Sequence, residues 1–260
     1  MRSLLVFFSA LLLTGCTWTH ARLTYDFNSM TSNSQVLYEA GAEDMATQVA
    51  ELLPASMQVI EEKHHAPFRD KDSIRVYVFN DRKRYASFSA ASIKSRGSAT
   101  TNEIYLSEKM REDIDTLPLI LIHELSHVHI RQYSGSFKYV TDIPGWFLEG
   151  IAVNVSTGGG AESVTAEQAK TAMRNGWHFR AVDRGRISGH YTAHDYGLEP
   201  HMYYRQAALF VKYLETSDPH AFARSIRDIL DGTRFREVWP EHYGRDITIL
   251  WQEYLEGIQA

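Results

Sequence analysis

The sequence predicts an α+β fold in which a small mixed sheet packs on a central helix and a mainly helical part follows. Three observations carry this prediction. Runs rich in β-branched and aromatic residues at 74–79 and 102–107 are typical of buried strands. An apolar run at 117–130 has the spacing of a buried helix, and helical patterns dominate from residue 203 to the end.

The first half of the chain is expected to alternate helices and strands. Residues 35–63 show a helical pattern that is interrupted or bent at Pro54. Asp81 is placed to cap a short helix that follows the first strand. The small residues at 97–101 indicate a loop before the second strand.

The second half is expected to be helical. Its first helix begins near Pro144, and a polar helix follows a glycine-rich turn at 158–160. The further helices are expected at 165–175, 203–216, 219–230, 235–243 and 246–255. The chain is long enough for one zincin-sized domain, or for two small lobes that share a core.

The helix at 117–130 contains the sequence His-Glu-Leu-Ser-His at 123–127. Pro118 fits its first turn, and Asp115 or Thr116 can cap it. The buried stripe is expected to consist of Leu117, Ile120, Leu121, Leu125 and Val128.

His123 and His127 are four residues apart, so both imidazoles lie on one helix face and can reach a single metal ion. Zinc is the metal expected, because it accepts neutral imidazole and keeps an open position when the protein supplies three ligands. Glu124 can lean over the same site as a general base. The alternative is an ordinary helix that carries two histidines by chance.

A third ligand is needed, and the residues directly after His127 do not supply it. Tyr133 stands where metzincin proteases have their third histidine. Glu149 is the one acidic residue of the helix expected at 144–152, where a charge among apolar neighbours is costly unless it is paired or bound to metal. The alternative for Glu149 is a solvated carboxylate on an outer face.

The chain resembles the gluzincin, or peptidase MA-like, zinc metallopeptidases. The resemblance rests on His-Glu-Leu-Ser-His at 123–127 and Trp-Phe-Leu-Glu-Gly-Ile-Ala at 146–152, and it extends to 203–211 and 235–255. It implies a zincin-like fold, with Zn²⁺ held by His123, His127 and Glu149. It also implies a tyrosine that steadies the oxyanion, which maps to Tyr204 with Tyr203 as the second choice.

By this resemblance, residues 103–106 are expected to form the edge strand beside the zinc helix, to which a peptide substrate adds. Val153 stands where thermolysin-like enzymes have an aspartate that orients a zinc histidine, so another group must do this. The Gly-x-Met-Glu-Asn segment of the aminopeptidase branch is absent, which favours an endopeptidase.

The predicted function is therefore zinc-dependent hydrolysis of peptide bonds in a peptide or protein substrate, by Glu124-assisted attack of zinc-bound water. Tyr204 and the zinc ion would stabilise the oxyanion. One alternative is a non-catalytic envelope lipoprotein that uses the fold as a binding or scaffold module. Another is a zinc hydrolase that acts on a non-peptide amide.

Two pairs of histidines outside this motif have spacings that call for an interpretation. His64 and His65 fall at the end of the first helix, where a positive charge suits the helix dipole and no catalytic role is expected. His190 and His194 lie in the long irregular stretch 176–200, which is typical of a binding loop or lid. The sequence allows two roles for His190 and His194: contact with a substrate, or a second metal site.

The N-terminus resembles a bacterial lipoprotein signal peptide at 1–15, followed by Cys16 in a lipobox-like sequence. Lipidation of Cys16 would anchor the protein in a membrane of the cell envelope. Thr17 favours the outer membrane, facing the periplasm. Cys16 is the single cysteine, so an intramolecular disulfide and cysteine-rich metal sites are excluded.

The predicted organisation is a tether at 16–34, an α/β lobe with the zinc helix at 35–135, and a helical lobe at 136–260. The formal net charge is -5 and no basic block is present, which argues against nucleic-acid binding. The sequence does not indicate an oligomeric state.

Overall fold

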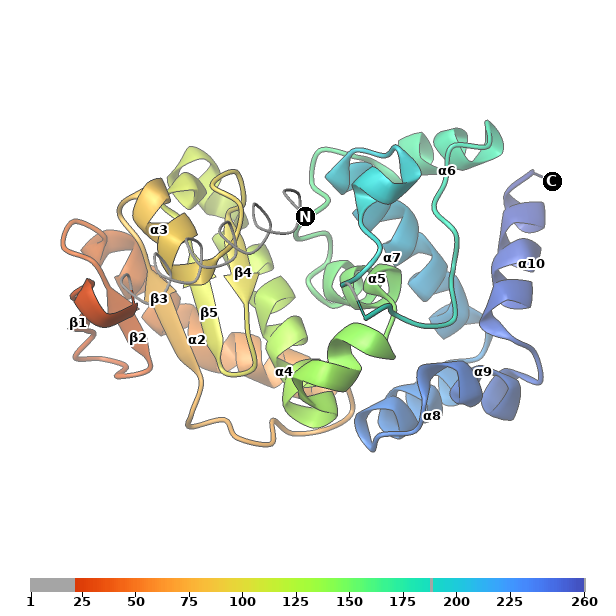
Figure 1. Cartoon of the computed structure of the whole chain (residues 1–260), viewed down its shortest axis with the longest axis horizontal. Helices are drawn as coiled ribbons and strands as arrows, with labels where there is room; N and C mark the ends of the chain where they lie inside the picture. Colours follow the sequence, from red (N-terminus) through yellow and green to blue (C-terminus); the bar gives the residue numbers. More distant parts are fainter. Residues whose placement is uncertain (1–21, 188, 260) are drawn as a thin grey trace, which may run out of the picture.

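The computed structural model describes residues 22–187 and 189–259, and it has a mixed α+β architecture. A sheet with its helices forms one part of the molecule, and a cluster of helices lies beside it (Figure 1). One hydrophobic core cluster contains buried residues from both parts. The α+β class predicted from the sequence is confirmed.

The sheet has five strands in the order β1-β2-β3-β5-β4. The central strands β2, β3 and β5 are parallel, whereas β1 and β4 pair antiparallel at the two edges. The strands are β1 (Asn28–Ser29), β2 (Val36–Tyr38), β3 (Arg75–Val78), β4 (Gly97–Ala99) and β5 (Glu103–Leu106).

Alternation along β3 divides the sheet into two packed faces. Val76 and Val78 point into the main core with α2 (Glu43–Lys63) and α4 (Leu117–Thr141). Tyr77 points to the opposite face, where a smaller aromatic cluster includes residues of α3 (Arg82–Ser89). As predicted, Asp81 caps α3 by accepting backbone hydrogen bonds from Lys83 and Arg84.

One prediction for the start of the chain is wrong. The helix expected at 35–63 begins only at Glu43, because Val36–Tyr38 pairs with β3 as a strand, and Pro54 lies inside the helix without ending it. Within the stretch expected as a tether, β1 pairs with β2 and the Phe27 ring packs on Phe79. The signal peptide and Cys16 lie outside the described residues.

The edge strand beside α4 is also not the one expected. β5 lies between β3 and β4, so the edge position belongs to Gly97–Ala99, which the sequence indicated as a loop. These small residues have little strand propensity of their own. Backbone pairing with β5 places them in the sheet.

The helix that carries His-Glu-Leu-Ser-His is α4, and all five residues of its predicted stripe are buried. Thr116 is the N-cap residue, but its side chain makes no capping hydrogen bond. The helix extends beyond the expected 117–130: it has a kink at Gly135, where φ is 69°, and the chain continues helically to Thr141.

Helices build the rest of the molecule. α5 (Gly145–Val155) begins after Pro144 as predicted, and it packs extensively against α7 (Pro200–Ser217). The remaining helices are α6 (Ala166–Arg174), α8 (Pro219–Leu230), α9 (Phe235–Tyr243) and α10 (Ile247–Gln259), with short 3₁₀ segments at Glu108–Thr116 and Ala193–Tyr196. Among the described residues, no helix combines the length and apolar character needed to cross a bilayer.

His64 differs from its prediction. Its ring is fully buried and contacts His129, with 3.0 Å between the two Nδ1 atoms. Burial holds the pKa of His64 well below its ordinary value, so the ring is neutral and contributes no charge to the helix dipole. Ser126 on α4 contacts its Nε2 at 3.2 Å, which completes a buried polar network.

Gly150 sets the separation of α5 and α7. A Cβ atom at this position would lie 2.7 Å from the Ala207 carbonyl oxygen, closer than real atoms approach. We predict that Gly150→Ala lowers the free energy of unfolding by about 1–3 kcal/mol, because the two helices must move apart. Urea unfolding measures this change.

The matched control is Gly257→Ala in α10, where a Cβ atom would meet nothing within 4 Å. This change should leave stability unchanged or raise it by up to about 1 kcal/mol. Equal stabilities for the two variants would contradict the proposed role of Gly150.

Candidate metal centre

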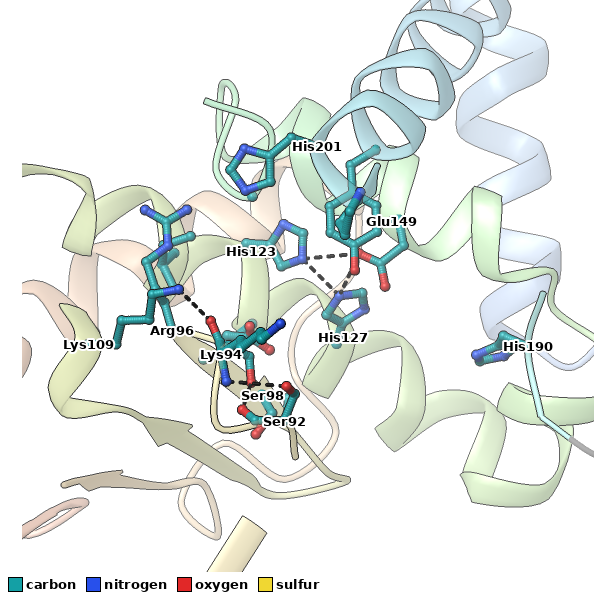
Figure 2. A pocket seen from close by; sticks show the side chains of 18 of the residues that line it. Ser92, Lys94, Arg96, Ser98, Lys109, His123, His127, Glu149, His190 and His201 are labelled. Atoms are coloured by element: carbon teal, nitrogen blue, oxygen red, sulfur yellow. Dashed lines mark hydrogen bonds and ion pairs between the residues drawn. The ribbon is translucent and has the colours of Figure 1, made fainter. Parts of the chain in front are cut away.

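Two helices bring His123, His127 and Glu149 together, as the sequence predicted. The Nε2 atoms of the two histidines are 3.1 Å apart. The Glu149 Oε2 atom lies 3.3 Å from the first and 3.7 Å from the second. Figure 2 shows all three side chains converging on one point. Within the described chain, they are the one group of three residues that can hold a metal ion.

The surroundings of Glu149 fit a bound cation. Its Oε2 atom is buried and has no hydrogen-bond partner, although it faces the two imidazoles. A buried carboxylate oxygen without a partner is costly. Burial opposes ionisation of Glu149, but the neighbouring histidines hold its pKa well below the usual range, so the carboxylate is charged and available as a ligand.

The other nitrogen of each histidine is held by a partner. His123 Nδ1 donates to the Gly159 carbonyl oxygen at 2.9 Å, and His127 Nδ1 lies 2.9 Å from the Tyr139 hydroxyl. With Nδ1 in these bonds, each Nε2 can offer its lone pair to a metal ion. Gly159 and Tyr139 therefore orient the two histidines, which the apolar side chain of Val153 cannot do.

The sequence did not reveal these two partners. Gly159 lies in the glycine-rich turn, where a Cβ atom would be only 2.5 Å from the Leu119 carbonyl oxygen, so the turn packs tightly on α4. Tyr139 follows the kink at Gly135, which turns the chain back towards His127. No local pattern marks either residue as part of the site.

Glu124 lies beside the three ligands and lines the same cavity. Its side chain is almost fully buried, and burial raises its pKa above the usual value. A carboxylate with a raised pKa is a better proton acceptor at neutral pH than an ordinary one. Gly97 gives it room, because a Cβ atom there would lie 2.9 Å from Glu124 Oε1.

The two candidate tyrosines face different surroundings. Tyr204 lines the cavity, and its ring centroid is 6.2 Å from that of His123. The charge of Glu149, together with burial, raises the pKa of Tyr204 well above its ordinary value, so its hydroxyl keeps its proton and can donate. Tyr203 is instead buried against Phe179, and its hydroxyl donates to the Tyr191 carbonyl oxygen at 3.3 Å.

The cavity has a volume of about 630 Å³ and runs along the edge strand β4. His190 lines it, and its Nε2 lies 2.8 Å from the Tyr139 carbonyl oxygen. His194 is exposed on a short 3₁₀ segment and does not join His190 in a group of metal ligands. Of the two histidines in this stretch, His190 is the one at the cavity.

Comparison with known proteins adds no assignment: no family model matches the sequence, and no match was found among curated proteins. The description of the site therefore rests on its own geometry. That geometry provides three ligands for a metal ion, a buried carboxylate beside them, and a protonated hydroxyl on the opposite helix.

We predict that Tyr139→Phe weakens metal binding by about 10–100-fold, because His127 loses the partner that holds its ring. Competition with a chromophoric chelator measures the affinity. Tyr243→Phe is the matched control, because this hydroxyl donates to Leu214 at 2.8 Å, away from the cavity. An unchanged affinity in Tyr139→Phe would rule out the orienting role.

Metal affinity should also fall with acidification. Burial alone would lower the pKa of His123, but the hydrogen bond and charge of Glu149 raise it above its ordinary value. Protonation of His123 therefore competes with metal binding at pH values below this raised pKa, because the protonated ring has no lone pair to offer. Affinity should drop about tenfold per pH unit below this raised pKa. A chelator titration from about pH 8 to about pH 5 measures it, and a constant affinity would contradict the prediction.

Proposed function

We propose that this protein is a zinc-dependent peptidase with a zincin-like fold, as the resemblance to the gluzincins implies. One observation carries the proposal: two imidazoles and a carboxylate converge beside the buried Glu124 at the wall of an open cavity. A purely structural cluster would not need a second buried carboxylate next to the first.

Zinc is proposed because the donor set suits it. Two imidazole nitrogens and one carboxylate oxygen are the ligands of many catalytic zinc sites. His123, His127 and Glu149 would hold the ion, which supplies Lewis acidity and lowers the pKa of a water to about 7. Metal analysis of the purified protein tests this assignment.

The chain's own residues then carry the proton and the negative charge. Glu124 takes a proton from the attacking water and passes it to the departing amine. The raised pKa of Glu124, which burial causes, suits both transfers. The protonated Tyr204 hydroxyl donates a hydrogen bond to the developing oxyanion, a contribution of about 3 kcal/mol for one such donor.

An extended peptide is the proposed substrate, because β4 is an edge strand of the sheet and borders the cavity. Backbone groups at a sheet edge can pair with an added strand and lay it across the metal centre. A cavity open along such an edge also suits a long chain better than a small amide. We therefore favour an endopeptidase.

The alternative of a non-catalytic scaffold rested on Val153, which replaces an orienting aspartate. Tyr139 and the Gly159 carbonyl already hold the two histidines, so this reason no longer favours a scaffold.

Anchoring through a lipidated Cys16 in the bacterial cell envelope remains part of the proposal, and labelling with a radioactive fatty acid tests it.

We predict that Glu124→Gln lowers kcat for peptide hydrolysis by about 10²–10⁴-fold while the zinc content stays at one ion per chain. The amide keeps the shape of the side chain but cannot accept the proton. Digestion of a mixed peptide library, followed by mass spectrometry, measures turnover. Glu256→Gln, on the exposed face of α10, is the control and should retain full activity.

Activity of Glu124→Gln equal to that of the unchanged protein would refute this role of Glu124. Loss of both zinc and activity would show instead that Glu124 acts as a structural element of the metal centre.

A further inference from the structure

One end of the cavity is basic. Lys94, Arg96, Lys109 and His201 all line it there, and we call this group the basic end. Figure 2 shows the four residues gathered on one side of the metal centre, while His190 lies on the other. They come from the loop before β4, from the 3₁₀ segment after β5 and from α7.

The two lysines of the basic end are not neutralised. Arg96 pairs with Glu162 at 2.6 Å and with Asp113 at 3.9 Å. Among the described residues, neither Lys94 nor Lys109 makes an ion pair with a carboxylate. Lys109 Nζ instead donates to the Lys94 carbonyl oxygen at 2.7 Å, which brings the second lysine to the backbone of the first.

The carboxylates that line the cavity cannot balance these charges. They are Glu124 and Glu149, and both belong to the metal centre. The chain as a whole is acidic, with a formal net charge of -5, so a local excess of cations runs against its composition. Like charges placed near one another cost free energy unless an anion joins them.

His201 adds a hydrogen-bond donor to the basic end. The Ser163 backbone N–H donates to His201 Nδ1 at 3.3 Å, so the proton of the neutral ring is on Nε2. The ring thus offers an N–H rather than a lone pair. A carboxylate, which only accepts hydrogen bonds, is the complementary ligand.

The position of the basic end relative to β4 defines which part of a peptide would reach it. Lys94 and Arg96 precede Gly97, so the basic end lies at the start of β4. We take the added strand to pair antiparallel with β4, because antiparallel pairs are the commoner kind, and it then runs from the Ala99 end to the Gly97 end. Its C-terminal part would therefore lie at the basic end.

We propose that the basic end selects peptides that carry a carboxylate on the C-terminal side of the cleaved bond, with Lys94 and Lys109 as the specificity-determining residues. The carboxylate belongs either to an aspartate or glutamate side chain or to the free C-terminus of the substrate. This inference rests on the proposed peptidase function and names its substrate class.

The test uses the zinc-loaded protein and matched peptide libraries in which Asp and Asn, or Glu and Gln, are exchanged at each position. Each library is made with a free and with an amidated C-terminus. We expect kcat/KM to be about tenfold higher for the acidic member of a pair, at positions after the cleaved bond. If the free C-terminus is the ligand, we expect the preference to be for the free over the amidated form of a peptide, whichever member of an Asp/Asn or Glu/Gln pair it carries.

The variant Lys94→Ser/Lys109→Ser should reduce the acidic preference to less than about twofold, and Lys94→Arg/Lys109→Arg should restore it. Lys83→Ser is the matched control, because this exposed lysine lies on α3 outside the cavity, and it should keep the full preference. High salt should weaken the preference in the unchanged protein.

Cleavage that favours neither acidic side chains nor a free C-terminus, or a preference that survives in Lys94→Ser/Lys109→Ser, would overturn the inference and leave the peptidase function standing. If no peptide is cleaved, the peptidase function fails. The same labelled peptides then test the basic end by fluorescence anisotropy. Tighter binding of the acidic members that depends on the two lysines supports it, and equal binding overturns it.

Discussion

The approach of α5 to α4 and α7 is the constraint on which the site depends. Glu149 and Gly150 are neighbours in sequence but face different helices, because adjacent residues of a helix point in different directions. Gly150 allows the α7 backbone to come close, and Glu149 turns its carboxylate towards the imidazoles of α4. A wider spacing between the helices would separate the three ligands and move Tyr204 away from them.

The buried polar atoms of the centre form a nearly complete set of contacts before any ion binds. Gly159 and Tyr139 hold the outer nitrogens of the histidines, and the inner nitrogens face Glu149. The unpartnered atom is Glu149 Oε2, at the point where the ligands meet. Such preorganisation reduces the cost of ordering the ligands when a metal binds.

The metal ligands and the two lysines proposed to set selectivity lie on different elements. The ligands come from α4 and α5, whereas Lys94 precedes β4 and Lys109 follows β5. A change at either lysine therefore need not disturb the ligands. The edge of β4 would position a peptide by hydrogen bonds to the peptide backbone, and the basic end would bind one carboxylate of that peptide.

The sequence by itself determined the helix with His123, Glu124 and His127, and it also indicated Glu149 and Tyr204 as neighbours of these residues. These expectations depend on helical spacing, on a costly charge in an apolar helix and on a resemblance to a family. The tertiary structure alone decided the edge strand Gly97–Ala99, the orienting roles of Tyr139 and Gly159, and the basic end. Those features bring together residues that are far apart in the chain, or they depend on residues of weak strand propensity. Packing and backbone pairing create them, so no local sequence pattern predicts them.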